Sequence, residues 1–156
     1  LTLIPYSSVM LGDGRYSNRP WMLEFPDPLT TVTWNSFAEL NPETAKRLGV
    51  STGDLVVIKS EAGTVEIPAI PTPGIHPDAI AVPVGYGRRT PAPNGPGHWS
   101  EVGTSVMKVL QPNFQAGSGE IAWNGTKVTV TRSSRHERLI VLDQRVNNLP
   151  RRVMPH

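Results

Sequence analysis

Proline and glycine limit the folds open to this chain more than any other feature of its sequence. The chain holds 16 prolines and 14 glycines among its 156 residues. Both residue types interrupt long helices but suit short strands that are joined by tight turns. This composition therefore predicts an all-β barrel or sandwich. A hydrophobic content of 38% is enough for one domain to bury a core without disulfides or metals.

One short helix has the clearest start and stop signals in the sequence. It is predicted in the segment "NPETAKRLGV", residues 41–50. Asn41 is a favoured N-cap, and Pro42 suits the first helical position. Glu43 lies at the positive end of the helix, and Gly49 is a typical stop. We therefore expect a helix of about two turns there.

Several segments are predicted to form strands. Segment 29–34, "LTTVTW", is dense in β-branched residues and places Val32 and Trp34 on one face. Segment 79–84, "AIAVPV", is typical of a short apolar strand. Residues 103–110 fit either one helical turn or a strand, and the sequence does not decide between them.

Two hairpins are also expected. Residues 53–70 predict one that turns at Glu61–Gly63. Residues 120–132 predict another, because the pair Asn124-Gly125 favours a type I′ turn. The side chains expected to face the core in these hairpins are Val57, Val65, Val128 and Val130.

Most catalytic and metal sites are excluded by what the sequence lacks. Without cysteine there is no disulfide, no thiolate nucleophile and no cysteine-ligated zinc or iron-sulphur cluster. The chain contains no Gly-x-Ser-x-Gly elbow and no short-range cluster of histidine and carboxylate. Its four histidines, none of which has a recognisable catalytic or metal-binding setting, are His76, His98, His136 and His156. We expect no catalytic residues and no metal held by this chain alone.

Charge and hydropathy narrow the choice of partners. The formal net charge is only +2, and the arginines are spread along the chain, so a nucleic-acid partner is not expected. No apolar run approaches the roughly 20 residues of a membrane span, which predicts a soluble chain without direct membrane insertion. The opening "LTLIPYSSVM" is not a signal peptide. A start at Leu1 suggests a processed protein or a domain of a longer parent.

Two Gly-x-Gly-Arg units are the strongest candidates for a binding site. They are Gly12-Asp13-Gly14-Arg15 and Gly85-Tyr86-Gly87-Arg88. Glycines let a backbone approach a ligand and expose its N–H groups, and a neighbouring arginine suits phosphate or a carbonyl edge. Neither unit has the third glycine and the long helix of a Rossmann or Walker site. Two ordinary turns with solvated arginines explain the same residues.

Aromatic residues lie in or beside these two loops. They could stack on a purine, although tryptophan more often fills a core. The residues concerned are Trp21, Trp34, Tyr86 and Trp99.

The order of these segments resembles a known family. The resemblance covers about residues 10 to 110 and rests on three stretches in sequence order: "GDGRYSNRPW", "TWNSFAELNPETAKRLGVSTGDLVVIKSEAGTVEIPA" and "PGIHPDAIAVPVGYGR". They resemble the molybdopterin dinucleotide-binding domain at the C-terminal end of molybdenum and tungsten oxidoreductases of the dimethyl sulphoxide reductase type. The likeness is greatest to the large iron-sulphur and molybdopterin-like subunit of membrane respiratory complexes, including the quinol-oxidising alternative complex III.

The resemblance implies a fold and a role. The fold is mainly β, a six-stranded double-psi β-barrel with one or two short helices, over residues 1–131, followed by a basic C-terminal extension over 132–156 that contains "LIVL". The domain would close over the molybdopterin guanine dinucleotide of an oxidoreductase and share this cofactor with upstream domains. The implied partners are those domains, with iron-sulphur and membrane subunits, and the parent would be membrane-associated on the cytoplasmic or periplasmic face.

The resemblance also implies which residues bind the cofactor. The first loop would contact the dinucleotide or pterin, Asn35 would lie near the guanosine, and the second loop would form another wall. The full set is Gly12, Gly14, Arg15, Asn18, Trp21, Asn35, Gly85, Tyr86, Gly87 and Arg88.

One departure from the family pattern supports a different function. After the second loop, "RTPAPNGPGHWSEVGTSV" is proline-rich and offers Asn94 in a different setting from the asparagine of the family. The alternative is a structural barrel without cofactor that packs on neighbours in a respiratory electron-transfer complex. An unrelated double-psi barrel enzyme or an ATPase recognition domain is a more distant third reading.

Overall fold

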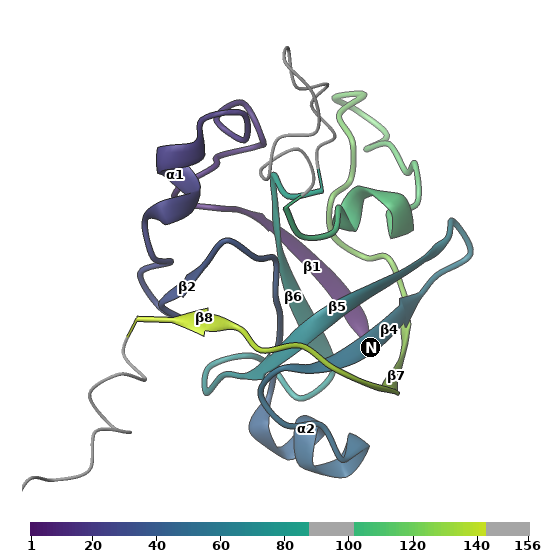
Figure 1. Cartoon of the computed structure of the whole chain (residues 1–156). Helices are drawn as coiled ribbons and strands as arrows, with labels where there is room; N and C mark the ends of the chain where they lie inside the picture. The colour runs from purple at the N-terminus through teal and green to yellow at the C-terminus, as the bar shows by residue number, and fades with distance from the viewer. Residues whose placement is uncertain (88–101, 143–156) are drawn as a thin grey trace, which may run out of the picture.

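The computed structural model describes residues 1–87 and 102–142 of the chain (Figure 1). The elements in these residues are β1 (Thr2–Ser7), α1 (Pro20–Glu24), β2 (Val32–Thr33), β3 (Ala38–Leu40), α2 (Pro42–Leu48), β4 (Asp54–Lys59), β5 (Thr64–Pro71), β6 (Ala79–Val84), the 3₁₀ helix η1 (Val106–Val109), β7 (Thr129–His136) and β8 (Ile140–Val141).

A six-stranded mixed sheet forms the body of the molecule. Its strand order is β1-β6-β3-β5-β4-β7, with β1 parallel to β6 and β3 parallel to β5. The other neighbours are antiparallel. β2 and β8 form a separate antiparallel pair, which lies on the same side of the molecule as α1 (Figure 1). The predicted mainly β fold with short helices is confirmed.

The two ends of the six-stranded sheet approach each other just before β7. Thr2 of β1 forms an isolated antiparallel bridge with Lys127. The Leu3 N–H donates to the Thr126 carbonyl at 2.9 Å, and the Val128 N–H donates to the Leu1 carbonyl at 2.9 Å. Within the described ranges, no ladder of the named strands joins β1 to β7.

The main core lies against one face of this sheet. Its largest fully buried aliphatic side chains include Leu3, Ile58, Ile67 and Ile80, and η1 adds Val106. Each such side chain contributes roughly 1.5–3 kcal/mol relative to an exposed one. A smaller core lies beneath β2 and β8, where Val32, Phe37 and Leu139 are buried together. The β2–β8 pair is therefore a second layer.

Helix α2 forms as its sequence signals predict. The Asn41 side chain accepts from the Glu43 N–H at 2.9 Å, and its amide donates to the Ile75 carbonyl at 2.7 Å. Gly49 ends the helix in the left-handed region with φ of 68°. Local hydrogen bonds and one loop contact thus fix both ends.

The first predicted hairpin is confirmed as β4 and β5. Val65 is 5% exposed, as predicted, but Val57 is only half-buried. The register explains this error, because the pairs Val56–Ile67 and Ile58–Val65 share the inward face and Val57 alternates with them.

The second predicted hairpin is wrong. β7 pairs antiparallel with β4, so that Ile58 faces Val130. Ile121 forms a bridge with Phe114, and the Ala122 N–H donates to the Asn113 carbonyl at 2.7 Å, so this segment pairs upstream. Val128 and Val130 are nevertheless buried, as predicted, because both pack into the main core. Tertiary pairing therefore overrides the local turn signal at Asn124-Gly125.

Of the strand predicted at 29–34, only the two residues of β2 are in a strand. The Asp27 carboxylate accepts from the Leu29 and Thr30 N–H groups at 3.1 and 2.8 Å, which holds residues 27–31 in a turn. Trp34, with φ of 56°, ends the strand on the other side. The pair of β2 with β8 uses the "LIVL" segment.

The predicted division at residue 131 falls inside β7. Residues 132–136 belong to the six-stranded sheet, and Ile140 and Val141 pair with β2. The division into two domains stays a prediction. Five elements, β1, α1, β3, η1 and β8, had no definite sequence signal.

The helices of the described residues are short. Within residues 1–87 and 102–142, none of them is long and apolar enough to cross a membrane.

Candidate functional site

The two Gly-x-Gly-Arg loops meet at one end of the sheet. They follow β1 and β6, which are parallel and paired from Thr2–Ala79 to Ser7–Val84. The two segments therefore leave the sheet side by side. A Cβ atom on Gly85 would lie 2.9 Å from the Leu11 Cβ and 3.3 Å from the Gly14 Cα. Gly14 and Gly85 have φ of 105° and 104°, a region that favours glycine. Backbone therefore packs directly on backbone at this point.

A third segment joins the two loops. The Gly87 N–H donates to the Val102 carbonyl at 2.9 Å, and a Cβ atom on Gly87 would overlap the backbone of Ser105. The three segments line an open surface pocket of about 450 Å³. Its lining residues are Asp13, Gly14, Arg15, Ser17, Gly85, Tyr86, Gly87, Ser105 and Met107. Sequence reasoning predicted five of these. It missed Asp13 and Ser17 beside the predicted residues of the first loop, and it missed Ser105 and Met107 because no local signal places residues 105–107 beside the loops.

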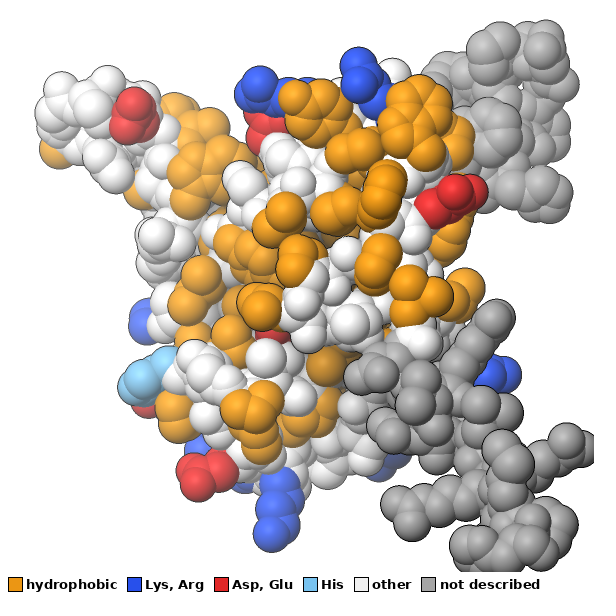
Figure 2. Space-filling view, turned by 90° about the vertical axis from the view of Figure 1, so that its left-hand side faces the viewer, with side chains coloured by type: hydrophobic (Ala, Val, Ile, Leu, Met, Phe, Trp, Pro, Cys, Tyr) orange, Lys and Arg blue, Asp and Glu red, His pale blue; other side chains and the backbone are white. Residues whose placement is uncertain are grey.

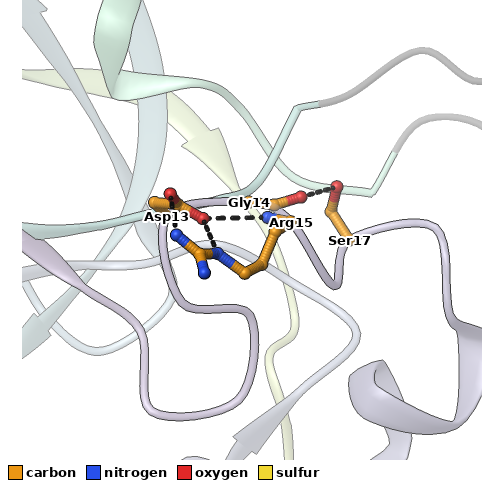
Figure 3. A network of polar contacts seen from close by, with 4 residues as sticks. All are labelled: Asp13, Gly14, Arg15 and Ser17. Atoms are coloured by element: carbon orange, nitrogen blue, oxygen red, sulfur yellow. Dashed lines mark hydrogen bonds and ion pairs between the residues drawn. The ribbon is translucent and has the colours of Figure 1, made fainter.

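Arg15 and Asp13 form an ion pair at the rim of the pocket (Figure 3). The Arg15 Nη2 lies 2.9 Å from the Asp13 Oδ2, and Nε lies 3.0 Å from Oδ1. These hydrogen bonds lower the pKa of Asp13 to about 2 and raise the pKa of Arg15. Both side chains are exposed, by 53% and 68%, so solvent screens the pair. The guanidinium charge is balanced locally, and Nη1 keeps two donors outside the pair.

Several backbone amide groups of the loops donate hydrogen bonds to other groups of the protein. The Gly12 N–H donates to the Ser8 carbonyl and the Gly14 N–H to the Leu11 carbonyl, at 2.8 and 3.0 Å. The Arg15 N–H donates to the Asp13 carboxylate at 3.1 Å. The Ser17 hydroxyl donates to the Gly14 carbonyl at 2.7 Å, which further fixes the first loop (Figure 3). The glycines thus provide close backbone access rather than a row of outward amides.

The remaining predicted residues lie away from the pocket lining. Asn18 is exposed, and Trp21 is 56% exposed on α1. The Asn35 amide donates to the Glu137 carboxylate at 2.7 Å, on the side of the molecule where β8 follows β7. Gly12 precedes the lining residues in the first loop. Arg88 lies outside the described residues.

A buried polar group lies close to the second loop. The Tyr6 hydroxyl donates to the Glu39 carboxylate at 2.7 Å, and Glu39 is only 4% exposed. Burial raises the pKa of Tyr6 far above its ordinary value, and the hydrogen bond to Glu39 raises it further. Burial also raises the pKa of Tyr86 to about 12, with a smaller contribution from the nearby Asp27. Both tyrosines are therefore held in the neutral form.

Alkaline pH is expected to destabilise the fold through these tyrosines. An unfolded tyrosine ionises near its ordinary pKa of 10.0, whereas folded Tyr6 and Tyr86 keep their protons to higher pH. The stability they contribute is fully present below pH 10 and is lost as the pH rises toward 12, by at most about 1.4 kcal/mol per pH unit for each tyrosine. Urea unfolding between pH 9 and 11 measures this slope.

The variant Tyr6→Phe separates the contribution of Tyr6 to the alkaline loss of stability from that of Tyr86. Its alkaline slope is expected to be smaller than that of the unchanged chain. At pH 7 it loses about 1–3 kcal/mol, because the buried Glu39 carboxylate loses its donor. Tyr16→Phe, at a tyrosine that is 37% exposed, is the matched control and should change neither quantity. Equal alkaline slopes in Tyr6→Phe and the unchanged chain would contradict this account.

Comparison with known proteins identifies the family and the fold of this chain. The model of the Molydopterin dinucleotide binding domain matches residues 27–127. The menaquinone reductase, molybdopterin-binding-like subunit, of Nitratidesulfovibrio vulgaris is 24% identical over 133 residues, which are 85% of this chain and 19% of that protein. A tetrathionate reductase subunit of Archaeoglobus fulgidus is 40% identical over 60 residues, which are 38% of this chain and 5% of that protein.

A solved structure shares the fold. Acetylene hydratase from Pelobacter acetylenicus superposes with a TM-score of 0.64 and 16% sequence identity, over 85% of this chain and 18% of that chain. At this identity the likeness shows the fold alone. The matched regions span only 5% to 19% of the length of these three proteins. The family model covers well over half of the chain, from the turn at Asp27 through the second glycine loop to Lys127, and this chain therefore belongs to the molybdopterin dinucleotide-binding domain family.

Proposed function

We propose that this chain is the domain that closes over the guanine dinucleotide part of a molybdopterin cofactor in an oxidoreductase. The observation that carries the proposal is the contact between Gly14 and Gly85, which unites two Gly-x-Gly-Arg loops in one pocket of a chain of this family. The catalytic centre would lie in parts of the parent enzyme outside this chain.

The pocket residues fit part of a dinucleotide. The volume of about 450 Å³ is in the range of small-molecule sites. Gly14, Gly85 and Gly87 leave no side chain between a ligand and the backbone. The Nη1 group of Arg15 would donate to a phosphate oxygen, and the Ser17 and Ser105 hydroxyls are further polar groups of the lining. Asn18, Trp21, Asn35 and Arg88 stay predictions outside this lining set.

We further propose that the sheet closes into the double-psi β-barrel that the sequence resemblance implies. The support is the bridge between Thr2 and Lys127, with its flanking hydrogen bonds between residues 1–3 and 126–128. These bonds bring the start of the sheet to the residues that lead into β7.

The parent enzyme is proposed to be a longer, multisubunit respiratory reductase that associates with a membrane through other subunits. The support is that curated relatives are named as reductase subunits, and that the relative from Chrysiogenes arsenatis is named as a subunit of an arsenate respiratory reductase. These proteins extend far beyond the matched region, which for the thiosulfate reductase molybdopterin-containing subunit PhsA of Salmonella typhimurium is 8% of that protein. Iron-sulphur subunits and upstream domains would be the partners.

Cofactor content of the purified parent enzyme tests the proposal. We expect molybdenum or tungsten, measured by mass spectrometry, together with guanine nucleotide released by acid. Arg15→Ala is expected to lower retention of both by about ten-fold, because a charge-assisted hydrogen bond to phosphate is lost. Arg47→Ala, at an exposed arginine of α2, is the control and should retain both. A parent without metal and nucleotide would overturn the proposal.

A second function has specific support. The Arg15 guanidinium is already paired with Asp13, and four loop amides are engaged inside the protein. This arrangement suits a structural domain without cofactor, and the relative matched over 85% of this chain is named molybdopterin-binding-like. On this alternative, Arg15→Ala leaves both assembly and electron transfer of the parent enzyme unchanged.

A further inference from the structure

One face of the molecule presents an exposed apolar strip, which we call the α1–β8 face. Its five side chains are 51% to 85% exposed. They are Trp21, Phe25, Leu29, Ile140 and Leu142. Figure 2 views the molecule from this side and shows hydrophobic side chains spread over the face, with lysine and arginine at its upper and lower edges.

The residues of the strip come from two distant parts of the sequence that the fold brings together. Trp21 lies on α1, Phe25 follows the last residue of that helix, and Leu29 lies in the turn that Asp27 holds. The Leu142 N–H donates to the Thr31 carbonyl at 3.4 Å, which brings the end of β8 to that turn.

The elements beneath the strip are apolar on both sides. Their inward side chains, Leu23 of α1, Val32 of β2 and Leu139 before β8, are 1% to 5% exposed, and Val32 and Leu139 belong to the smaller core. A surface element normally has one apolar side and one polar side, and apolar residues on both sides indicate a buried element. The outward side chains nevertheless keep more than half of their surface exposed within the described residues.

The exposed apolar area is large for an isolated surface. Five half-exposed aromatic and aliphatic side chains amount to on the order of 500 Å², near the upper end for a soluble monomer, where such a patch commonly binds a partner. None of the five carries a charge, so the complementary surface is expected to be apolar as well.

We infer that the α1–β8 face packs against the part of the parent polypeptide that lies outside this chain. The inference rests on the proposed function only in requiring a longer parent, and the matched regions of 5% to 19% of the relatives support that requirement. The strip begins close in sequence to the pocket. Pro20 begins α1 three residues after Ser17, which lines the pocket, and the Arg19 guanidinium covers the Tyr16 ring at 5.3 Å between them.

Site-specific crosslinking in the intact parent enzyme tests this inference. A photoreactive benzoylphenylalanine replaces Phe25, and in the matched control it replaces Arg47 of α2, at the opposite end of the fold from α1 (Figure 1). We expect the probe at position 25 to crosslink within the same polypeptide to residues outside this chain, as read by peptide mass spectrometry. The probe at position 47 should form at least ten-fold less of this product.

Other crosslinks would overturn the inference. A covalent dimer of two parent polypeptides would assign the face to a second copy, and a crosslink to a different protein of the complex would assign it to that protein. No product above that of the control would show a solvated face. The outcome does not depend on cofactor content, so a parent that lacks molybdenum and nucleotide can still give the expected crosslink, and a loaded parent can fail to give it.

A substitution gives an independent readout. Leu29→Asp in the parent enzyme is expected to lower its thermal unfolding midpoint by several degrees, because a charge enters an apolar contact. Leu29→Met keeps the apolar contact and should retain the midpoint. An unchanged midpoint in Leu29→Asp would mean that Leu29, which is 85% exposed in this chain, stays exposed in the parent.

Discussion

Replacing Gly85 with alanine is expected to lower the free energy of unfolding by about 2–5 kcal/mol. An alanine at φ of 104° costs about 1–2 kcal/mol by itself. Its Cβ would also lie 2.9 Å from the Leu11 Cβ and 3.3 Å from the Gly14 Cα, and relieving such an overlap costs about 1–3 kcal/mol more. The two glycine loops would have to separate, so the pocket would change shape. Urea unfolding of the 156-residue chain measures the loss.

Gly74→Ala is the matched control for this prediction. Gly74 has φ of 111°, nearly the same as that of Gly85, but a Cβ there meets nothing within 4 Å. It should cost only the conformational part, about 1–2 kcal/mol. Equal losses in the two variants would show that the loops do not pack backbone on backbone.

Replacing Asp54 with alanine is expected to cost about 2–3 kcal/mol. The Asp54 carboxylate, on a residue 6% exposed, accepts from the Ser51 N–H at 2.9 Å and pairs with the Arg132 Nη2 at 3.0 Å. It also lies 3.1 Å from the His136 Nδ1. The variant leaves a Ser51 donor without its acceptor and weakens the junction of β4 with β7. Thermal or urea unfolding at pH 7 measures the loss.

Acid should remove the same stabilisation. The Ser51 and His136 hydrogen bonds lower the pKa of Asp54 below its ordinary value of 3.8, so the stability that Asp54 contributes is present above about pH 4 and is lost as the pH falls through the lowered pKa. Asp54→Ala should therefore lose less stability than the unchanged chain between pH 5 and pH 2. Asp78→Ala, at an exposed aspartate, is the control and should stay within about 0.5 kcal/mol at pH 7. A parallel decline in Asp54→Ala and the unchanged chain would contradict the role of Asp54.

The sequence predicts best the structures that are fixed by neighbouring residues. Helix α2 depends on Asn41, Pro42 and Gly49, all within or next to the helix, and its caps form as expected. The β4–β5 hairpin likewise depends on strands close in sequence. The Asn124-Gly125 signal failed because the strand that follows it pairs with β4, far away in the sequence, and long-range pairing outweighs a local turn preference.

The residues of the candidate site likewise divide into those that the sequence predicts and those that only the fold brings to the pocket. The glycines of both loops were recognisable because few other residues adopt positive φ, and the family resemblance followed from the order of the segments. Ser105 and Met107 were not recognisable, because contacts between residues distant in sequence, such as that of Gly87 with Ser105, bring them to the pocket. Asn35 was expected beside a ligand, but in the folded chain its amide donates to Glu137.

The sequence by itself determined the mainly β composition, the helix α2, the hairpin of β4 and β5, and the two Gly-x-Gly-Arg loops. Only the tertiary structure decided that these loops form one pocket. The physical reason is the parallel pairing of β1 with β6, in which Ser7 lies opposite Val84 and both strands end at the same edge. Gly14 and Gly85 are then close enough that neither can carry a side chain without moving the other.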